Sequence, residues 1–66
     1  MDIDINNIDI ELLRRDLIDY FTALMFNVSP AALVDLSKVE GATDIEVIQI
    51  AIDNKFDLEK YVIYRK

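Results

Sequence analysis

The chain has 66 residues, carries a net charge of −6 and contains neither cysteine nor histidine. The missing cysteines exclude disulfides, thiolate nucleophiles and zinc–sulfur sites, and the missing histidines remove the commonest general base and metal ligand. We therefore expect no enzyme, no cofactor and no metal centre. Apolar residues make up 53% of the sequence, above the roughly 45–50% of an average globular chain. One small domain, residues 1–66, cannot bury all of them, so we expect contact with another protein chain.

The opening residues, "MDIDINNIDIEL", alternate acids with isoleucines. A calcium loop starting at Asp2 needs an acid at its twelfth position, where the chain has Leu13, so this alternative is disfavoured. The alternation also suits a strand, and residues 1–8 would then pair with residues 60–66 as a two-stranded ribbon. The alternative that we favour is an extended lead-in whose isoleucines lie on the helices. The sequence leaves open whether either end is ordered, helical or part of such a ribbon.

The first predicted helix spans about residues 9–26 and is the longest element. Asp9 suits its N-cap, and Ile8 and Leu13 are spaced for a hydrophobic staple across that cap. We expect Asn27 to end the helix, because Asn tolerates the left-handed conformation found at many helix ends. The carboxylates of this helix fall on its polar face, which favours solvated side chains over catalytic acids.

A second helix is predicted at about residues 30–39. Ser29 and Pro30 signal its start, because proline fits the first helical position after a serine N-cap. Gly41 is the only glycine in the chain, and we expect it to end this helix.

A third helix is predicted at about residues 44–54. Thr43 and Glu46 match a capping box at its start, and Asn54 suits its C-cap. Apolar side chains cover about 220° of its circumference at 100° per residue, which is typical of a central or interfacial helix. Asp57 then suits the N-cap of a short final helical element.

The predicted fold class is therefore all-α: a small bundle of three helices, at about residues 9–26, 30–39 and 44–54, plus a short fourth C-terminal helical element. Each element contributes one apolar side to the expected core. That core consists of Leu13, Leu17, Phe21, Leu24, Leu33, Leu36, Ile45, Ile48, Ala51, Ile52 and Leu58.

The charge pattern excludes several kinds of partner. Residues 30–54 have the outline of a helix-turn-helix, but the helix that would read DNA, residues 44–54, contains acids and no lysine or arginine. An acidic body repels phosphate backbones and anionic membranes, so we expect neither nucleic acid nor membrane as a partner. The longest uncharged run, residues 20–34, is too short and too interrupted to span a bilayer. No small-molecule substrate is evident.

A candidate interaction patch combines apolar residues that the core does not need with one arginine inside the apolar stripe. Leu12 and Phe26 lie across the first helix from its stripe, and Met25 precedes the predicted turn. Arg14 falls within the apolar stripe, where either its stem covers apolar surface or its charge meets a partner's carboxylate. The third helix, which is apolar over about 220° of its circumference, contributes two more positions. The complete candidate patch is Leu12, Arg14, Met25, Phe26, Val47 and Ile50.

Three segments carry a resemblance: "DLIDYFTALMF", "DLSKVE" and "AIDNKFDLEKY". With them the whole chain resembles a set of short uncharacterised bacterial helical proteins, a resemblance that implies no activity. Separately, "IEVIQIAIDNKFDLEKYVI" looks like the second half of a ubiquitin-associated three-helix domain. The Met-Gly-Phe loop that such domains use for binding is replaced here by "VEGAT", so this second resemblance implies shared packing geometry only.

Two functions are compatible with these features. The first is a non-enzymatic, small acidic protein–protein interaction module of the cytoplasm that forms a homodimer through its surplus apolar surface. The alternative is an acidic inhibitor or regulator, of phage or mobile-element origin, that binds a basic protein through the acids of residues 1–19 and 35–54. Steep salt dependence of binding would favour the alternative, and salt-insensitive self-association would favour the first.

Overall fold

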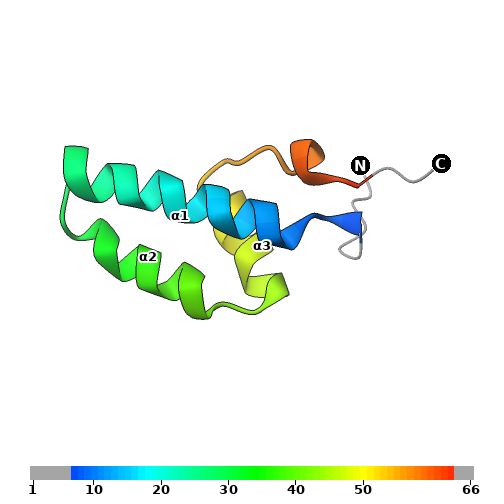
Figure 1. The fold of residues 1–66 in the computed structure, drawn as a ribbon, viewed down its shortest axis with the longest axis horizontal. Helices are drawn as coiled ribbons and strands as arrows, with labels where there is room; N and C mark the ends of the chain where they lie inside the picture. Colours follow the sequence, from blue (N-terminus) through cyan, green and yellow to red (C-terminus); the bar gives the residue numbers. More distant parts are fainter. Residues whose placement is uncertain (1–6, 64–66) are drawn as a thin grey trace.

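A computed structural model describes residues 7–63 of the chain. It contains three α-helices, α1 (Ile10–Asn27), α2 (Ala32–Gly41) and α3 (Asp44–Asp53), followed by a short 3₁₀ helix, η2 (Leu58–Tyr61). α1 and α2 form an antiparallel hairpin, and α3 packs across α1 close to the end of α1 where the chain enters the helix (Figure 1). The predicted all-α bundle with a short fourth element is confirmed.

The start of α1 follows from local chemistry. The Asp9 side chain accepts a hydrogen bond from the backbone N–H of Leu12 at 3.1 Å, which confirms the predicted N-cap. Ile8 and Leu13 both belong to the buried core, as the hydrophobic staple requires. The end differs from the prediction: α1 ends at Asn27, but Asn27 does not adopt the left-handed conformation. The N–H of Val28 instead bonds to the Leu24 carbonyl at 2.8 Å, which continues the helical pattern through the turn.

α2 begins two residues later than predicted. The Ser29 hydroxyl accepts a hydrogen bond from the N–H of Ala31 at 3.2 Å, and the backbone then makes successive i→i+3 bonds, of which Ala32 to Ser29 is the first. These bonds form a tighter turn ahead of the α-helix, so Ser29 starts the turn rather than capping α2. At the other end, Gly41 is the last helical residue, close to where the sequence predicted the stop.

α3 has the capping box that the sequence predicts. Thr43 accepts a hydrogen bond from the N–H of Glu46 at 3.3 Å, and the Glu46 carboxylate accepts one from the N–H of Thr43 at 2.9 Å. Asn54 is the C-cap, and Asp57 caps η2, both as predicted. Among the described residues, Lys55 adopts the left-handed backbone conformation, with a φ of 62°.

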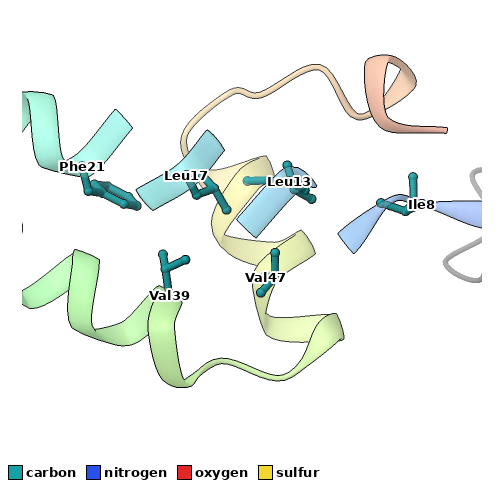
Figure 2. Packing of buried hydrophobic residues seen from close by; sticks show 7 residues of the cluster. Ile8, Leu13, Leu17, Phe21, Val39 and Val47 are labelled. Carbon is teal, nitrogen blue, oxygen red and sulfur yellow. The ribbon is translucent and has the colours of Figure 1, made fainter. Parts of the chain in front are cut away.

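The core lies between α1 and the two helices that cross it. Leu13, Leu17 and Phe21 form a row along α1, and Val39 of α2 and Val47 of α3 point toward that row (Figure 2). Half-buried side chains surround this row; they include Leu24, Leu36, Ile48 and Leu58 from the predicted core. The buried residues are Ile8, Leu13, Leu17, Phe21, Ala32, Val39, Val47 and Ala51.

Three residues of the predicted core are wrong: Leu33, Ile45 and Ile52 are 52%, 67% and 50% exposed. The buried positions of the two short helices carry valine and alanine instead. The large side chains of α1 already fill the space between the helices, and an interior packed at crystal-like density leaves room there for small partners only. The larger side chains of Leu33, Ile45 and Ile52 are therefore turned outward.

The two ends of the described chain meet in one antiparallel β-bridge between Ile8 and Val62. The N–H of Asp9 donates to the Tyr61 carbonyl at 2.7 Å, and the N–H of Ile63 donates to the Asn7 carbonyl at 2.6 Å. The pairing that the ribbon alternative predicted is present at this bridge, whereas the favoured lead-in had no such pairing. The ribbon contacts and calcium ligands expected at residues 1–6 and 64–66 lie outside the described residues.

Candidate interaction surface

The α1–α2 hairpin is longer than the body of the molecule. The end of α3 lies beside Phe21 of α1 and Asp35 of α2. These two residues line one hollow together with Asp53 and Asn54 at the end of α3. Beyond that level the two helices continue alone to their connecting turn (Figure 1). We call this overhanging part, residues 22–34, the hairpin end. A pair of helices has no enclosed core of its own, so apolar side chains there lack a third element to cover them.

The hairpin end is uncharged and exposes large apolar side chains. It lies within the run of residues 20–34, which contains no acid and no base. Phe26 and Val28 are 78% and 75% exposed, and Leu33 and Val34 are more than half exposed. Isolated exposed apolar residues are ordinary on protein surfaces, but a contiguous group marks an interaction surface. Four of the eight large apolar side chains that are exposed in the described part of the chain thus belong to the hairpin end.

The candidate patch from the sequence is divided by the fold. Phe26 and the half-buried Met25 belong to the hairpin end. Leu12 is half-buried near the opposite end of α1, in a polar depression that it shares with Asp9 and Arg15. The six predicted residues therefore do not form one surface.

Val47 is a correction to that patch. Its side chain is completely buried against α1 (Figure 2) and cannot contact a partner of the folded protein. The sequence placed it outward because α3 is apolar around most of its circumference, so that several rotations of the helix satisfy the pattern equally. Ile50 is half-buried and lines the hollow between α2 and α3.

Arg14 is used within the chain. Its guanidinium donates a hydrogen bond from Nη1 to the Val39 carbonyl at 2.6 Å. The last carbonyls of a helix have no partner within the helix, and a cation there also complements the helix dipole. Arg14 thus supports the end of α2 instead of offering its charge to a partner's carboxylate.

Between α2 and α3 lies a hollow of about 300 Å³ lined by Lys38, Gly41, Ala42, Glu46, Gln49 and Ile50. A second hollow of about 210 Å³ continues from it and shares Lys38 and Ile50. The two hollows are lined by three acids, Asp35, Glu46 and Asp53, and by one base, Lys38, so their charge is negative. Hydrogen bonds with Thr43 lower the pKa of Glu46, so its carboxylate stays ionised to a more acidic pH than an ordinary glutamate.

The outer side of α3 is a further exposed apolar feature that the sequence placed in the core. Ile45 and Ile52 are seven residues apart, which is about 20° short of two full helical turns at 100° per residue. They therefore share one side of the helix, and both are at least half exposed. Gln49 and Asp53, which hydrogen bond to each other at 3.0 Å, stand next to them. Acids therefore adjoin this apolar stripe, whereas none adjoins Phe26 in sequence.

Tyr61 joins η2 to α1. Its hydroxyl donates a hydrogen bond to the Asp16 carboxylate at 2.7 Å. Partial burial, followed by the hydrogen bond to Asp16 and the negative charge of that carboxylate, raises the pKa of Tyr61 to about 12. Nearby, the ring of Phe56 packs edge-on against Tyr20 with ring centres 5.3 Å apart. These contacts hold the segment after α3 against α1 and leave the hairpin end uncovered.

No family model, no curated protein and no solved structure matches the chain. The resemblance to short bacterial helical proteins thus stays a prediction. Within residues 7–63, no group of three acidic side chains is arranged to hold a metal ion. In the same part of the chain, every helix is too short or too polar to cross a membrane.

Proposed function

We propose that the protein is a non-enzymatic protein-interaction module that self-associates through its hairpin end. The observation that carries this proposal is the exposure of Phe26, Val28 and Leu33 on an uncharged overhang that no other element of the described chain covers. Shielding such side chains from water is the dominant driving force in protein association. We place this module in the bacterial cytoplasm, in keeping with a cysteine-free acidic chain that resembles bacterial proteins.

The exposed apolar surface is sufficient for a reversible dimer. Complete burial of one Val, Leu or Phe side chain contributes about 1.5–3 kcal/mol. Scaled by the exposed fractions of Phe26, Val28 and Leu33, two copies together would gain about 6–12 kcal/mol. Loss of translational and rotational freedom costs about 4–15 kcal/mol. At the favourable end of both ranges the net gain is about 8 kcal/mol, which corresponds to a dissociation constant of about 1 μM. We therefore expect a dimer that dissociates on dilution through the micromolar range.

The test is the solution mass, measured by light scattering over a hundredfold dilution at low and high salt. We expect a dimer at the upper concentrations at both salt levels, because the contact carries no charge. Phe26→Asp should be monomeric throughout, since each contact would bury two carboxylates. Ile45→Asp is the matched control: it adds the same charge at another apolar position that is mostly exposed, on α3, and should still dimerise.

Two results would contradict the proposal. If the wild-type protein stays monomeric at every concentration, the proposed self-association does not occur. A dimer that survives Phe26→Asp and is lost in Ile45→Asp would move the contact to the outer side of α3. Circular dichroism of both variants should match the wild type, because each substituted side chain is exposed in the folded monomer.

A second candidate function is an acidic regulator, of phage or mobile-element origin, that binds a basic protein. The specific observation in its favour is the pair of hollows between α2 and α3, where Asp35, Glu46 and Asp53 surround the half-buried Ile50. A basic peptide with one apolar anchor has the complementary chemistry. Binding of such a peptide that weakens steeply with salt, and fails in the double variant Glu46→Gln, Asp53→Asn, would support this function.

A further inference from the structure

We propose that the self-association inferred above has a defined geometry: two copies join end to end, with their hairpin ends side by side and antiparallel, around a twofold axis. This inference rests on the proposed function and adds the arrangement of the second copy. Each copy supplies two helices, so the contact completes a four-helix unit. A four-helix unit encloses a core that a single pair of helices lacks.

The position of the exposed side chains indicates which side of the hairpin end is covered. Leu33 is about 200° around α2 from Asp35, at 100° per residue, and Asp35 lines the hollow beside α3. Leu33 therefore lies on the side of the hairpin away from α3. Phe26 is likewise about 200° around α1 from Leu24, which packs against the core. A second hairpin can reach these side chains without meeting α3.

Charge selects the antiparallel orientation. The acids lie in residues 1–19 and 35–59, outside the uncharged run at residues 20–34, and each copy has a net charge of −6. A parallel arrangement would bring the two acidic bodies together along their length. The antiparallel arrangement moves the bodies to opposite ends of the dimer, beyond the Debye length of about 8 Å at physiological salt. Repulsion between the bodies then scarcely opposes association.

The same geometry closes the assembly at two copies. Each chain has one hairpin end, and a twofold axis uses the same surface on both partners. Once the two hairpin ends have met, neither copy retains a free one. The structure thus predicts a dimer that does not grow into longer chains at high concentration.

Inter-label distances test the arrangement directly, and the absence of native cysteine allows single labels at chosen positions. Ala23→Cys and Glu11→Cys, each carrying a nitroxide, are exposed sites on α1 near and far from the hairpin end. With a rise of 1.5 Å per residue, the antiparallel dimer should separate the two labels at position 11 by about 40 Å. The two labels at position 23 should lie within about 20 Å, since neighbouring helices are 8–10 Å apart. Asn27→Cys gives a second short pair.

Dipolar spectroscopy and light scattering on the same labelled samples separate the possible failures. Dimers with a short Ala23 pair and a long Glu11 pair support the arrangement. Dimers in which both pairs are short require a parallel arrangement, and dimers with the order reversed require contact through the body; either result overturns this inference but keeps self-association. Unlabelled wild-type protein that is monomeric at the same concentration overturns the proposed function and this inference together.

Discussion

Arg14 offers a sharp test of how the three helices are held together. It lies in the apolar stripe of α1, and its guanidinium reaches the carbonyl of Val39 in α2 at 2.6 Å. That carbonyl also accepts a long bond of 3.3 Å from the N–H of Ala42. Arg14→Ala removes the stronger of these two bonds together with the aliphatic stem. Arg14→Met keeps most of the stem and removes only the bond.

The expected loss is large for a chain of this size. A hydrogen bond from a charged donor contributes about 1.5–3 kcal/mol, and the remaining Ala42 bond places the loss for Arg14→Met in the lower part of that range. With the stem also removed, Arg14→Ala should destabilise the fold by about 2–3 kcal/mol. Cores of this size supply only about 3–5 kcal/mol in total. At roughly 4–8 °C per kcal/mol, the midpoint of thermal unfolding should fall by about 10–20 °C.

The assay is thermal and urea unfolding followed by circular dichroism, at protein concentrations where the wild type is monomeric. Arg15→Ala is the matched control, because Arg15 is the exposed neighbour and makes no side-chain hydrogen bond within the described part of the chain. It should change stability by no more than about 0.5 kcal/mol. Equal midpoints for Arg14→Ala and Arg15→Ala would refute the role assigned to the Val39 bond.

Three further predictions follow from single residues. Val47→Ala should lower the free energy of unfolding by about 2 kcal/mol in a urea titration, because a fully buried side chain loses two methyl groups. Ile45→Ala, at an exposed site of the same helix, should lower it by less than about 0.5 kcal/mol. Equal losses would contradict the orientation of α3 that buries Val47 and exposes Ile45. Lys55→Gly should raise the unfolding midpoint, because Lys55 has a φ of 62° that glycine adopts without strain; a lower midpoint would count against this reasoning. The pKa of Tyr61 is raised to about 12 in the fold, against about 10 when unfolded, so stability should be complete below about pH 10 and decline as the pH rises toward 12. Tyr61→Phe should lack that decline when urea midpoints are measured across the same pH series. Identical pH profiles for wild type and Tyr61→Phe would show that ionisation of Tyr61 does not cause the decline.

The features predicted correctly from the sequence depend on neighbours close along the chain. The caps at Asp9, Thr43 and Asp57 each use a side chain that bonds to a backbone group two or three residues away. Such bonds involve only residues that are close along the chain, so their spacing is visible in the sequence. The starts of α1, α3 and η2 followed from these caps, whereas α2, which has no side-chain cap, begins two residues later than predicted.

The features that were predicted wrongly depend on how helices rotate against one another. A ten-residue helix with four isoleucines can pack through more than one side. The space left by α1 accommodates Val47 and leaves Ile45 exposed. Arg14 found its acceptor 25 residues away along the chain, a distance at which no spacing rule applies. Of the candidate patch, only Met25 and Phe26 fall at the hairpin end, because the uncharged run at residues 20–34 was visible in the sequence but its overhang beyond α3 was not.

The bridge between Ile8 and Val62 makes the domain suitable for insertion into a loop of another protein. Strands paired in this way lie about 5 Å apart, so the described stretch enters and leaves at one point. A surface loop of a host protein could therefore be replaced by this domain without forcing the ends of the loop apart. The hairpin end would project from the opposite side, at the far end of an α1 helix about 27 Å long. Two host proteins fitted in this way would be coupled at a separation fixed by the length of the insert.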